Sequence, residues 1–137
     1  MLFRSFCCGE PLSVREAGAH KEYVADQLKE SLFHLHPSEI RYMAIAYEPV
    51  WAIGTGKTAT NDQAQEMHAH LRAVFAEKYG QDIADTISIL YGGSVKASNA
   101  KEIFAEPDVD GGLVGGASLL AADFGTIIDS TKKYATV

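Results

Sequence analysis

Residues 43–49 read Met-Ala-Ile-Ala-Tyr-Glu-Pro, five apolar side chains in a row followed by a carboxylate and a proline. A short, continuous apolar run is typical of a strand buried on both faces of a parallel sheet. Three further runs share this pattern, at residues 6–8, 87–91 and 112–114. The chain therefore has four predicted strands of the parallel type.

A helical segment is predicted after each of these runs, because apolar side chains recur there at helical spacing. The four sets are Val24, Leu28, Leu32 and Leu35; Ala64, Met67, Leu71 and Val74; Ala100, Ile103 and Phe104; and Phe124, Ile127 and Ile128. Thr60 followed by Gln63 predicts a capping box at the start of the second helix. An extra half-turn is expected at residues 81–85.

Strand and helix thus alternate four times, which predicts an α/β fold with a parallel sheet. The repeat is about 35 residues, and eight such units would approach the ~250 residues of a complete β/α barrel. We therefore expect half of an eight-stranded barrel. From the pattern alone, a doubly wound open sheet is the alternative.

The composition is that of an ordinary globular chain. The 137 residues carry 12 Lys+Arg against 18 Asp+Glu, a net charge of −6, and 47% are apolar. This balance excludes a disordered chain. The lack of a Lys/Arg cluster argues against a nucleic-acid partner. No apolar run approaches the roughly 18 residues of a membrane span. No secretory signal is evident at the start, so a cytoplasmic protein without membrane contact is expected.

Cys7 and Cys8 are the only cysteines. Neighbours in a strand point to opposite faces, so the pair is not expected to form a disulfide. Both are predicted to be small buried residues in a reducing compartment.

Glu48 stands at the carboxyl end of a predicted strand, where β/α barrels carry their chemistry. Taken alone, a Glu there is most often a solvated loop residue. The loop that follows is too apolar to stay in water, and its glycines permit close backbone approach. It is therefore predicted to be a lid that closes and expels water, which would make Glu48 a stronger base. The lid comprises Pro49, Val50, Trp51, Ala52, Ile53, Gly54, Thr55, Gly56, Lys57, Thr58 and Ala59.

Part of that lid resembles the end of a nucleotide-binding motif. Gly56-Lys57-Thr58 ends like a P-loop, but Trp51 stands where the motif needs its first glycine. A P-loop is therefore excluded.

Two more glycine segments follow predicted strands, Tyr91-Gly92-Gly93-Ser94-Val95 and Leu113-Val114-Gly115-Gly116-Ala117-Ser118. Exposed backbone amides next to a helix start favour an anion, and the Ser94 hydroxyl can also donate. Tight turns without a ligand are the alternative. Two such segments beside a lid favour phosphate binding, which barrels commonly place after their last two strands.

No metal site is expected. His68 and His70 lie two apart on a helix and face different ways, and no carboxylate or thiol shares their spacing.

Three blocks together resemble the triosephosphate isomerase family: residues 46–57, 91–95 and 111–119. The resemblance covers residues 6–128 and includes Cys7-Cys8-Gly9-Glu10. It implies a TIM (β/α)8 barrel, of which this chain would supply strands 5–8. It also implies interconversion of dihydroxyacetone phosphate and glyceraldehyde 3-phosphate through an enediolate, without metal or organic cofactor.

The resemblance also implies roles for individual residues. Glu48 would be the base that moves a proton between C1 and C2. Gly54, Ser94, Gly115 and Gly116 would bind the phosphate. Tyr91 and Ser94 would hold the closed lid, and Glu10 would meet the Trp51 indole when the lid is open.

The sequence departs from the family by beginning inside what looks like the fifth strand. The family's Lys and Asn after the first strand and its His electrophile after the fourth have no counterpart here. Loss of one such electrostatic contact typically costs roughly 10²–10³ in rate, so the isolated chain is expected to be inactive or nearly so. The family's homodimer contacts also lie mainly in the missing half. Residues 1–5 fit poorly as a central strand and are interpreted as a non-native leader, with the half-barrel domain spanning 6–137.

Two other interpretations stay open. One is a non-catalytic half-barrel that only binds phosphate. The other is a different phosphate-binding barrel enzyme, such as a sugar-phosphate isomerase. A desolvated base argues against the first, and the Glu48 lid argues against the second.

Overall fold

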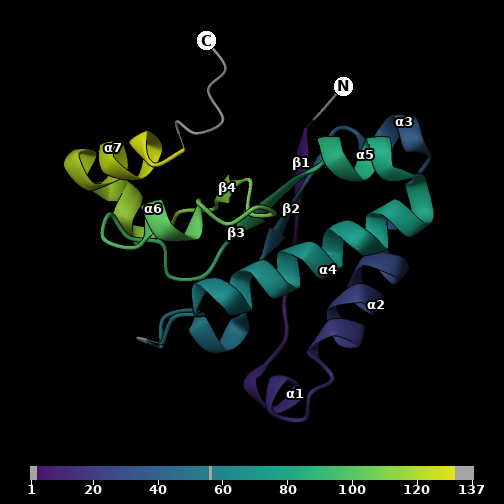
Figure 1. The fold of residues 1–137 in the computed structure, drawn as a ribbon, viewed down its shortest axis with the longest axis horizontal. Coiled ribbons are helices and arrows are strands. Elements are labelled where there is room, and N and C mark those ends of the chain that lie inside the picture. The colour runs from purple at the N-terminus through teal and green to yellow at the C-terminus, as the bar shows by residue number, and fades with distance from the viewer. Residues whose placement is uncertain (1–2, 56, 132–137) are drawn as a thin grey trace.

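The computed structural model describes residues 3–55 and 57–131. It contains one sheet of parallel strands in the order β1-β2-β3-β4 (Figure 1). The strands are β1 (Arg4–Cys8), β2 (Met43–Tyr47), β3 (Ser88–Tyr91) and β4 (Gly111–Gly112). A doubly wound sheet reverses its strand order at a switch point, and this sheet does not. The fold is therefore an α/β arrangement consistent with part of a β/α barrel.

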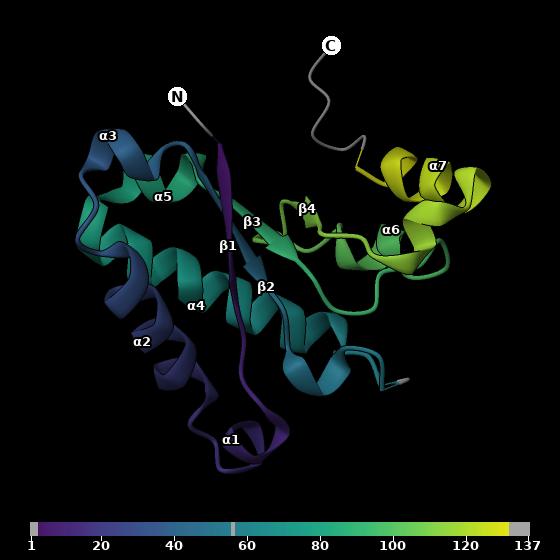
Figure 2. The ribbon, with the colours of Figure 1, turned by 180° about the vertical axis from the view of Figure 1, so that it is seen from behind.

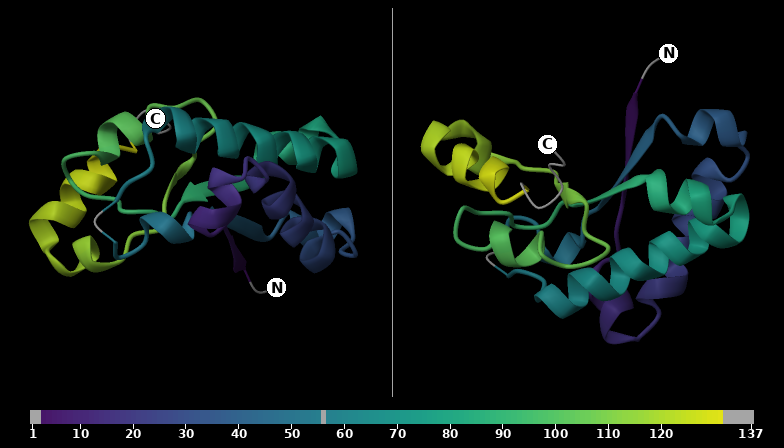
Figure 3. Two further views of the ribbon diagram at one scale, coloured as in Figure 1. Left: turned by 90° about the horizontal axis from the view of Figure 1, so that it is seen from below. Right: turned by 45° about the horizontal axis from the view of Figure 1, so that its top comes forward.

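The helices fall between and after the strands. They are α1 (Leu12–Glu16), α2 (His20–Leu32), α3 (Pro37–Ile40), α4 (Asn61–Tyr79), α5 (Gln81–Thr86), α6 (Ala100–Ile103) and α7 (Ala121–Asp129). Two 3₁₀ turns, η1 (Val50–Ala52) and η2 (Gly116–Leu119), follow β2 and β4. Figure 3 shows α6 and α7 grouped at one end of the molecule, with α2 and α3 toward the other.

The predicted capping box is confirmed at the start of α4. The Gln63 amide donates to Thr60 Oγ1 at 3.1 Å, and the Thr60 amide donates to Gln63 Oε1 at 2.9 Å. The helix therefore begins directly after the predicted lid and has a fixed first turn. Helix α3 was not predicted; a second capping box, in which Glu39 accepts from the His36 amide, stabilises it.

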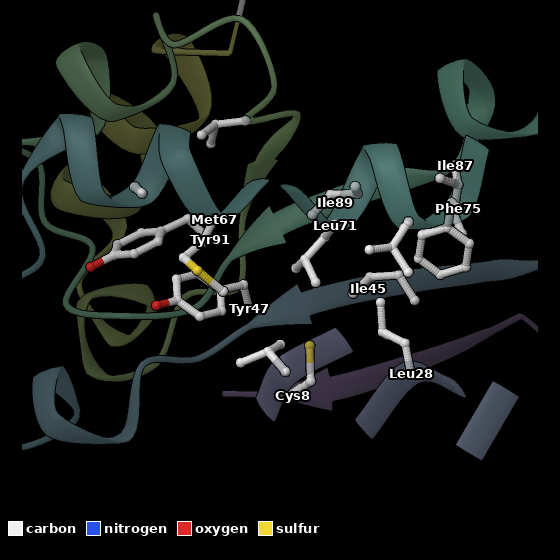
Figure 4. Close-up of a cluster of buried hydrophobic side chains, with 14 of the residues drawn as sticks. Cys8, Leu28, Ile45, Tyr47, Met67, Leu71, Phe75, Ile87, Ile89 and Tyr91 are labelled. Carbon is white, nitrogen blue, oxygen red and sulfur yellow. The ribbon is translucent and has the colours of Figure 1, made fainter. Parts of the chain in front are cut away.

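The core lies between one face of the sheet and the helices. Ile45 and Tyr47 of β2 and Ile89 and Tyr91 of β3 point toward α2 and α4, where Leu28, Met67, Leu71 and Phe75 meet them (Figure 4). All of these side chains are essentially inaccessible to solvent. The apolar stripes predicted for these two helices are thus the stripes that face the sheet.

Figure 2 views the sheet from the side opposite α4, with β1 in front of that helix. This opposite face carries mostly small side chains, of which Ala44 and Ala46 are buried. Alternation along the paired strands places Ser5, Cys7, Ala44, Ala46, Ser88 and Leu90 there. The prediction that every strand is buried on both faces is therefore wrong for β1 and β3, because Cys7 and Ser88 are exposed. The interpretation of both cysteines as buried fails for Cys7 and holds for Cys8.

The strand bounds differ slightly from the predicted ones. Strand β1 begins at Arg4 instead of residue 6, and Arg4 and Ser5 pair with Met43 and Ala44. Strand β4 is short and begins one residue early, at Gly111. Residues 1 and 2 of the proposed leader lie outside the described residues, as do residues 132–137 of the proposed domain. The leader itself stays a prediction.

Candidate active site

One pocket at the carboxyl ends of the strands brings together the residues predicted to act on substrate. It has a volume of about 380 Å³, and Glu48, Gly54, Ser94, Gly115 and Gly116 all line it. These residues follow β2, β3 and β4, three neighbouring strands of the parallel sheet. The carboxyl ends of parallel strands share one edge, and this explains why residues so distant in the sequence meet.

Glu48 lies immediately after β2, and its backbone amide donates to the Cys8 carbonyl at 2.7 Å. Its half-buried side chain lines this pocket and also a second one of about 280 Å³ that includes Cys7 and Gln27. Gly92 makes room for the side chain, since a Cβ there would stand 2.5 Å from Glu48 Cγ. Glu48 is thus held between the ends of β1 and β3.

Cys7 is a site residue that the sequence interpretation missed. It lines the second pocket with Glu48, and interaction with the Glu48 carboxylate, together with partial desolvation, raises the pKa of Cys7 to about 11. The thiol therefore remains neutral at physiological pH. The signal available in the sequence was the alternation along β1, which points Cys7 away from the helices and toward the end of the neighbouring strand.

The glycine residues leave the far side of the pocket open. Gly115 and Gly116 are exposed, and a Cβ on either would meet no atom within 4 Å. The Gly115 amide donates no backbone hydrogen bond within the described part of the chain. Gly54 adopts a φ of +65°, a conformation that favours glycine. Backbone groups at these positions are accessible to a ligand in the pocket.

The predicted lid makes hydrogen bonds with two of the three residues that were assigned to hold it, Glu10 and Ser94, whereas the buried Tyr91 hydroxyl has no hydrogen-bond partner within the described residues. The Trp51 indole donates to Glu10 Oε1 at 3.2 Å, and the Ser94 hydroxyl donates to the Ala52 carbonyl at 3.0 Å. Burial raises the pKa of Tyr91, and the backbone of Ala59 partly counteracts that rise. The Ser94 hydroxyl therefore uses its one proton in the bond to the lid. It would have to break this bond before it could donate to a ligand in the pocket.

The described residues of the lid are partly buried. Pro49, Ala52 and Ala59 are buried, whereas Val50 and Ile53 are about half exposed. The Thr55 hydroxyl donates to the Trp51 carbonyl at 2.7 Å. Gly56, predicted as part of the lid, lies outside the described residues.

Lys96 is a residue of the first pocket that the sequence interpretation did not single out. It follows the Tyr-Gly-Gly-Ser-Val block directly and lines the pocket with Glu48 and the glycine residues. It is the one cationic side chain among the described lining residues, and none of those residues is a histidine. No group of three or more His, Cys, Asp or Glu side chains gathers around a possible metal position in residues 3–55 and 57–131.

Fold and pocket together describe an α/β protein, consistent with part of a β/α barrel, with a carboxylate and a glycine-rich pocket at the strand ends. Comparison with known proteins makes this specific. The family described as triosephosphate isomerase matches residues 2–131. The chain belongs to the triosephosphate isomerase family.

Individual relatives agree with this assignment. The chain is 60% identical over 129 residues to triosephosphate isomerase of Cytophaga hutchinsonii. The matched residues make up 94% of this chain and 50% of the relative. The chain is 60% identical over 125 residues to the Porphyromonas gingivalis enzyme and 62% identical over 125 residues to the Bacteroides fragilis enzyme. These matches cover 91% of this chain, and 50% and 49% of the two relatives. The chain spans about half the length of the curated relatives it matches. No helix in the described ranges has the length and apolarity needed to cross a bilayer.

Proposed function

We propose that this chain is the C-terminal half of a triosephosphate isomerase, which interconverts dihydroxyacetone phosphate and glyceraldehyde 3-phosphate. The observation that carries the proposal is the single pocket shared by Glu48 and the open backbone of Gly54, Gly115 and Gly116. A base and an anion site within one small pocket suit a substrate that has an acidic C–H bond at one end and a phosphate at the other.

In this proposal Glu48 removes a proton from C1 of the bound ketone, and the electron pair forms an enediolate with its charge on O2. Glu48 then returns a proton to C2, and the proton of O1 moves to O2, which gives the aldehyde at C1. General base catalysis of this kind contributes typically 10²–10⁴ in rate. The neutral Cys7 thiol lies beside the carboxylate in the second pocket and adds no charge there.

The phosphate is proposed to bind through the amides of Gly54, Gly115 and Gly116 and through Ser94. Lys96 lies at the same pocket and would attract the dianion. The lid, residues 49–59, would close over the enediolate, keep water out and prevent loss of phosphate. Tyr91, Ser94 and Glu10 would hold the lid in its alternative positions.

The isolated chain is proposed to turn over little or no substrate. The described lining residues include a base and one cation, but no histidine that could polarise the substrate carbonyl. The same observation favours the second candidate function, a half-barrel that binds phosphate without catalysis. A cytoplasmic location and a homodimer of the complete enzyme belong to the proposal, as does the absence of a nucleic-acid partner.

The test is a hybrid in which the portion of the Cytophaga hutchinsonii enzyme outside the match is joined to this chain. We expect the hybrid to isomerise dihydroxyacetone phosphate, and we expect Glu48→Gln to lower kcat by about 10²–10⁴. Glu16→Gln, an exposed carboxylate of α1, is the matched control and should leave kcat unchanged. A folded hybrid that binds phosphate but shows no turnover would favour the non-catalytic function instead.

A further inference from the structure

Arg15 of helix α1 occupies the junction between the lid and two other elements. Its Nη1 donates to Glu10 Oε1 at 3.0 Å, and its Nη2 lies 3.6 Å from Glu66 Oε2. Its guanidinium carbon lies over the Trp51 ring, 5.3 Å from the centroid. The Arg15 side chain is 12% exposed, so these contacts are largely protected from solvent. A single side chain therefore contacts the acceptor of the Trp51 indole and the indole ring itself.

Glu10 depends on this arginine. Its side chain is fully buried, and Oε1 accepts from three donors, Arg15, the Tyr47 hydroxyl at 2.9 Å and the Trp51 indole. Oε2 is buried and has no hydrogen-bond partner within the described residues. A buried carboxylate is costly unless a cation compensates it, and Arg15 forms an ion pair with Glu10 at 3.0 Å.

Arg15 also connects the two ends of the lid. Trp51 lies near the start of the lid, in η1, whereas Glu66 lies in α4, which begins at Asn61 directly after the lid ends. Lys21 binds Glu66 at 2.9 Å, and this hydrogen bond, with the charges of Lys21, His20 and Arg15, lowers the pKa of Glu66. Glu66 is therefore anionic at neutral pH and attracts the guanidinium from the α4 side.

We infer that Arg15 is a positioning residue that sets the orientation of Trp51, and through Trp51 the position of the lid. It does so in two ways: it holds the Glu10 carboxylate in place to accept from the indole, and it covers the face of the ring. Both effects depend on a planar guanidinium, which can stack and bind carboxylates at the same time. The effect of Arg15 on the orientation of Trp51 does not depend on whether the chain is an enzyme. The effect of that orientation on catalysis rests on the function proposed above.

The test uses the fluorescence of Trp51, which is the only tryptophan of the chain. In Arg15→Gln the indole loses its stacked cation and a stable acceptor. We expect a red shift of the emission maximum and a rise of about tenfold in the fraction of indole that acrylamide reaches, equivalent to about 1.4 kcal/mol. The matched control is Arg41→Gln, an exposed arginine next to α3, which should leave both readings unchanged.

Arg15→Lys keeps the inference testable if Arg15→Gln does not fold. The ammonium group still compensates Glu10 but cannot lie as a plane on the indole while binding Glu66. We expect its quenching to fall between those of the wild type and Arg15→Gln. Glu66→Gln should move the quenching in the same direction by a smaller amount. Wild-type emission and quenching in Arg15→Lys and in folded Arg15→Gln would overturn the inference, as would an equal shift in Arg41→Gln.

A second readout separates positioning from simple support of the fold. In an active hybrid, a misplaced lid should release more phosphate from the enediolate for each isomerisation, while the midpoint of thermal unfolding of Arg15→Lys stays near that of the wild type. An unchanged ratio of phosphate release to isomerisation, with Trp51 displaced, would overturn the link to the lid. An inactive wild-type hybrid would count against the proposed function alone, because the fluorescence test does not require turnover.

Discussion

Adding one methyl group at Gly92 should displace the proposed base without touching the phosphate contacts. The Cβ of alanine would stand 2.5 Å from Glu48 Cγ and 3.3 Å from Glu48 Cδ. Carbon atoms in favourable contact are about 3.5–4 Å apart, so the Glu48 side chain must move by about 1 Å. A displacement of that size in an active site can cost about 10²-fold in rate. We therefore expect Gly92→Ala to lower kcat of the hybrid by about two orders of magnitude.

The assay is the rate of isomerisation by the hybrid, with the unfolding midpoint measured in parallel. KM should change much less than kcat, because Gly54, Gly115 and Gly116 keep their geometry. Gly125→Ala in α7 is the matched control, since a Cβ there meets no atom within 4 Å. A Gly92→Ala hybrid with wild-type kcat would refute the placement of the working carboxylate beside Gly92.

Two further predictions concern stability. Burial lowers the pKa of His68 to about 4 from 6.5, so the unfolded chain binds a proton that the folded chain does not between these pH values. The free energy of unfolding therefore keeps its full value above about pH 6.5 and falls by roughly 3 kcal/mol as the pH drops toward 4. Urea unfolding across this range should show that fall, and the fall should be smaller in His68→Leu by the share that His68 causes. Thr60→Ala removes one half of the capping box of α4 and should lower the free energy of unfolding by about 1 kcal/mol. Thr60→Ser should restore most of that loss, and equal stability of all three proteins would contradict the capping role.

The strands and the longer helices could be predicted because their sequence signals are local. The run at Met43–Tyr47 predicted β2 with its observed bounds, and Thr60 and Gln63 located the start of α4. The bounds of strand β4 were harder to predict, because its two residues, Gly111 and Gly112, have no side chains that could indicate a strand. Its position depends on pairing with β3, which a local pattern does not reveal.

The residues of the pocket were predictable where they belong to strand-end motifs and unpredictable where only tertiary contacts bring them in. Glu48 and the glycine segments follow apolar runs, and parallel strands place their carboxyl ends together. Outside this pocket, Cys7 could be placed only from the alternation along β1, and Arg15 depends on the packing of α1 against the lid, which no local pattern indicates. The burial of Cys7 was predicted wrongly because an apolar run does not say which face of the sheet is covered.

The most direct test of the proposed chemistry is to run the hybrid reaction from dihydroxyacetone phosphate in D₂O and examine C2 of the product. If Glu48 takes up a proton and returns one through an enediolate, the glyceraldehyde 3-phosphate should carry deuterium from solvent at C2, and Glu48→Gln should slow its appearance by about 10²–10⁴. An equal rate of deuterium incorporation by Glu48→Gln would contradict the assignment of Glu48 as the base.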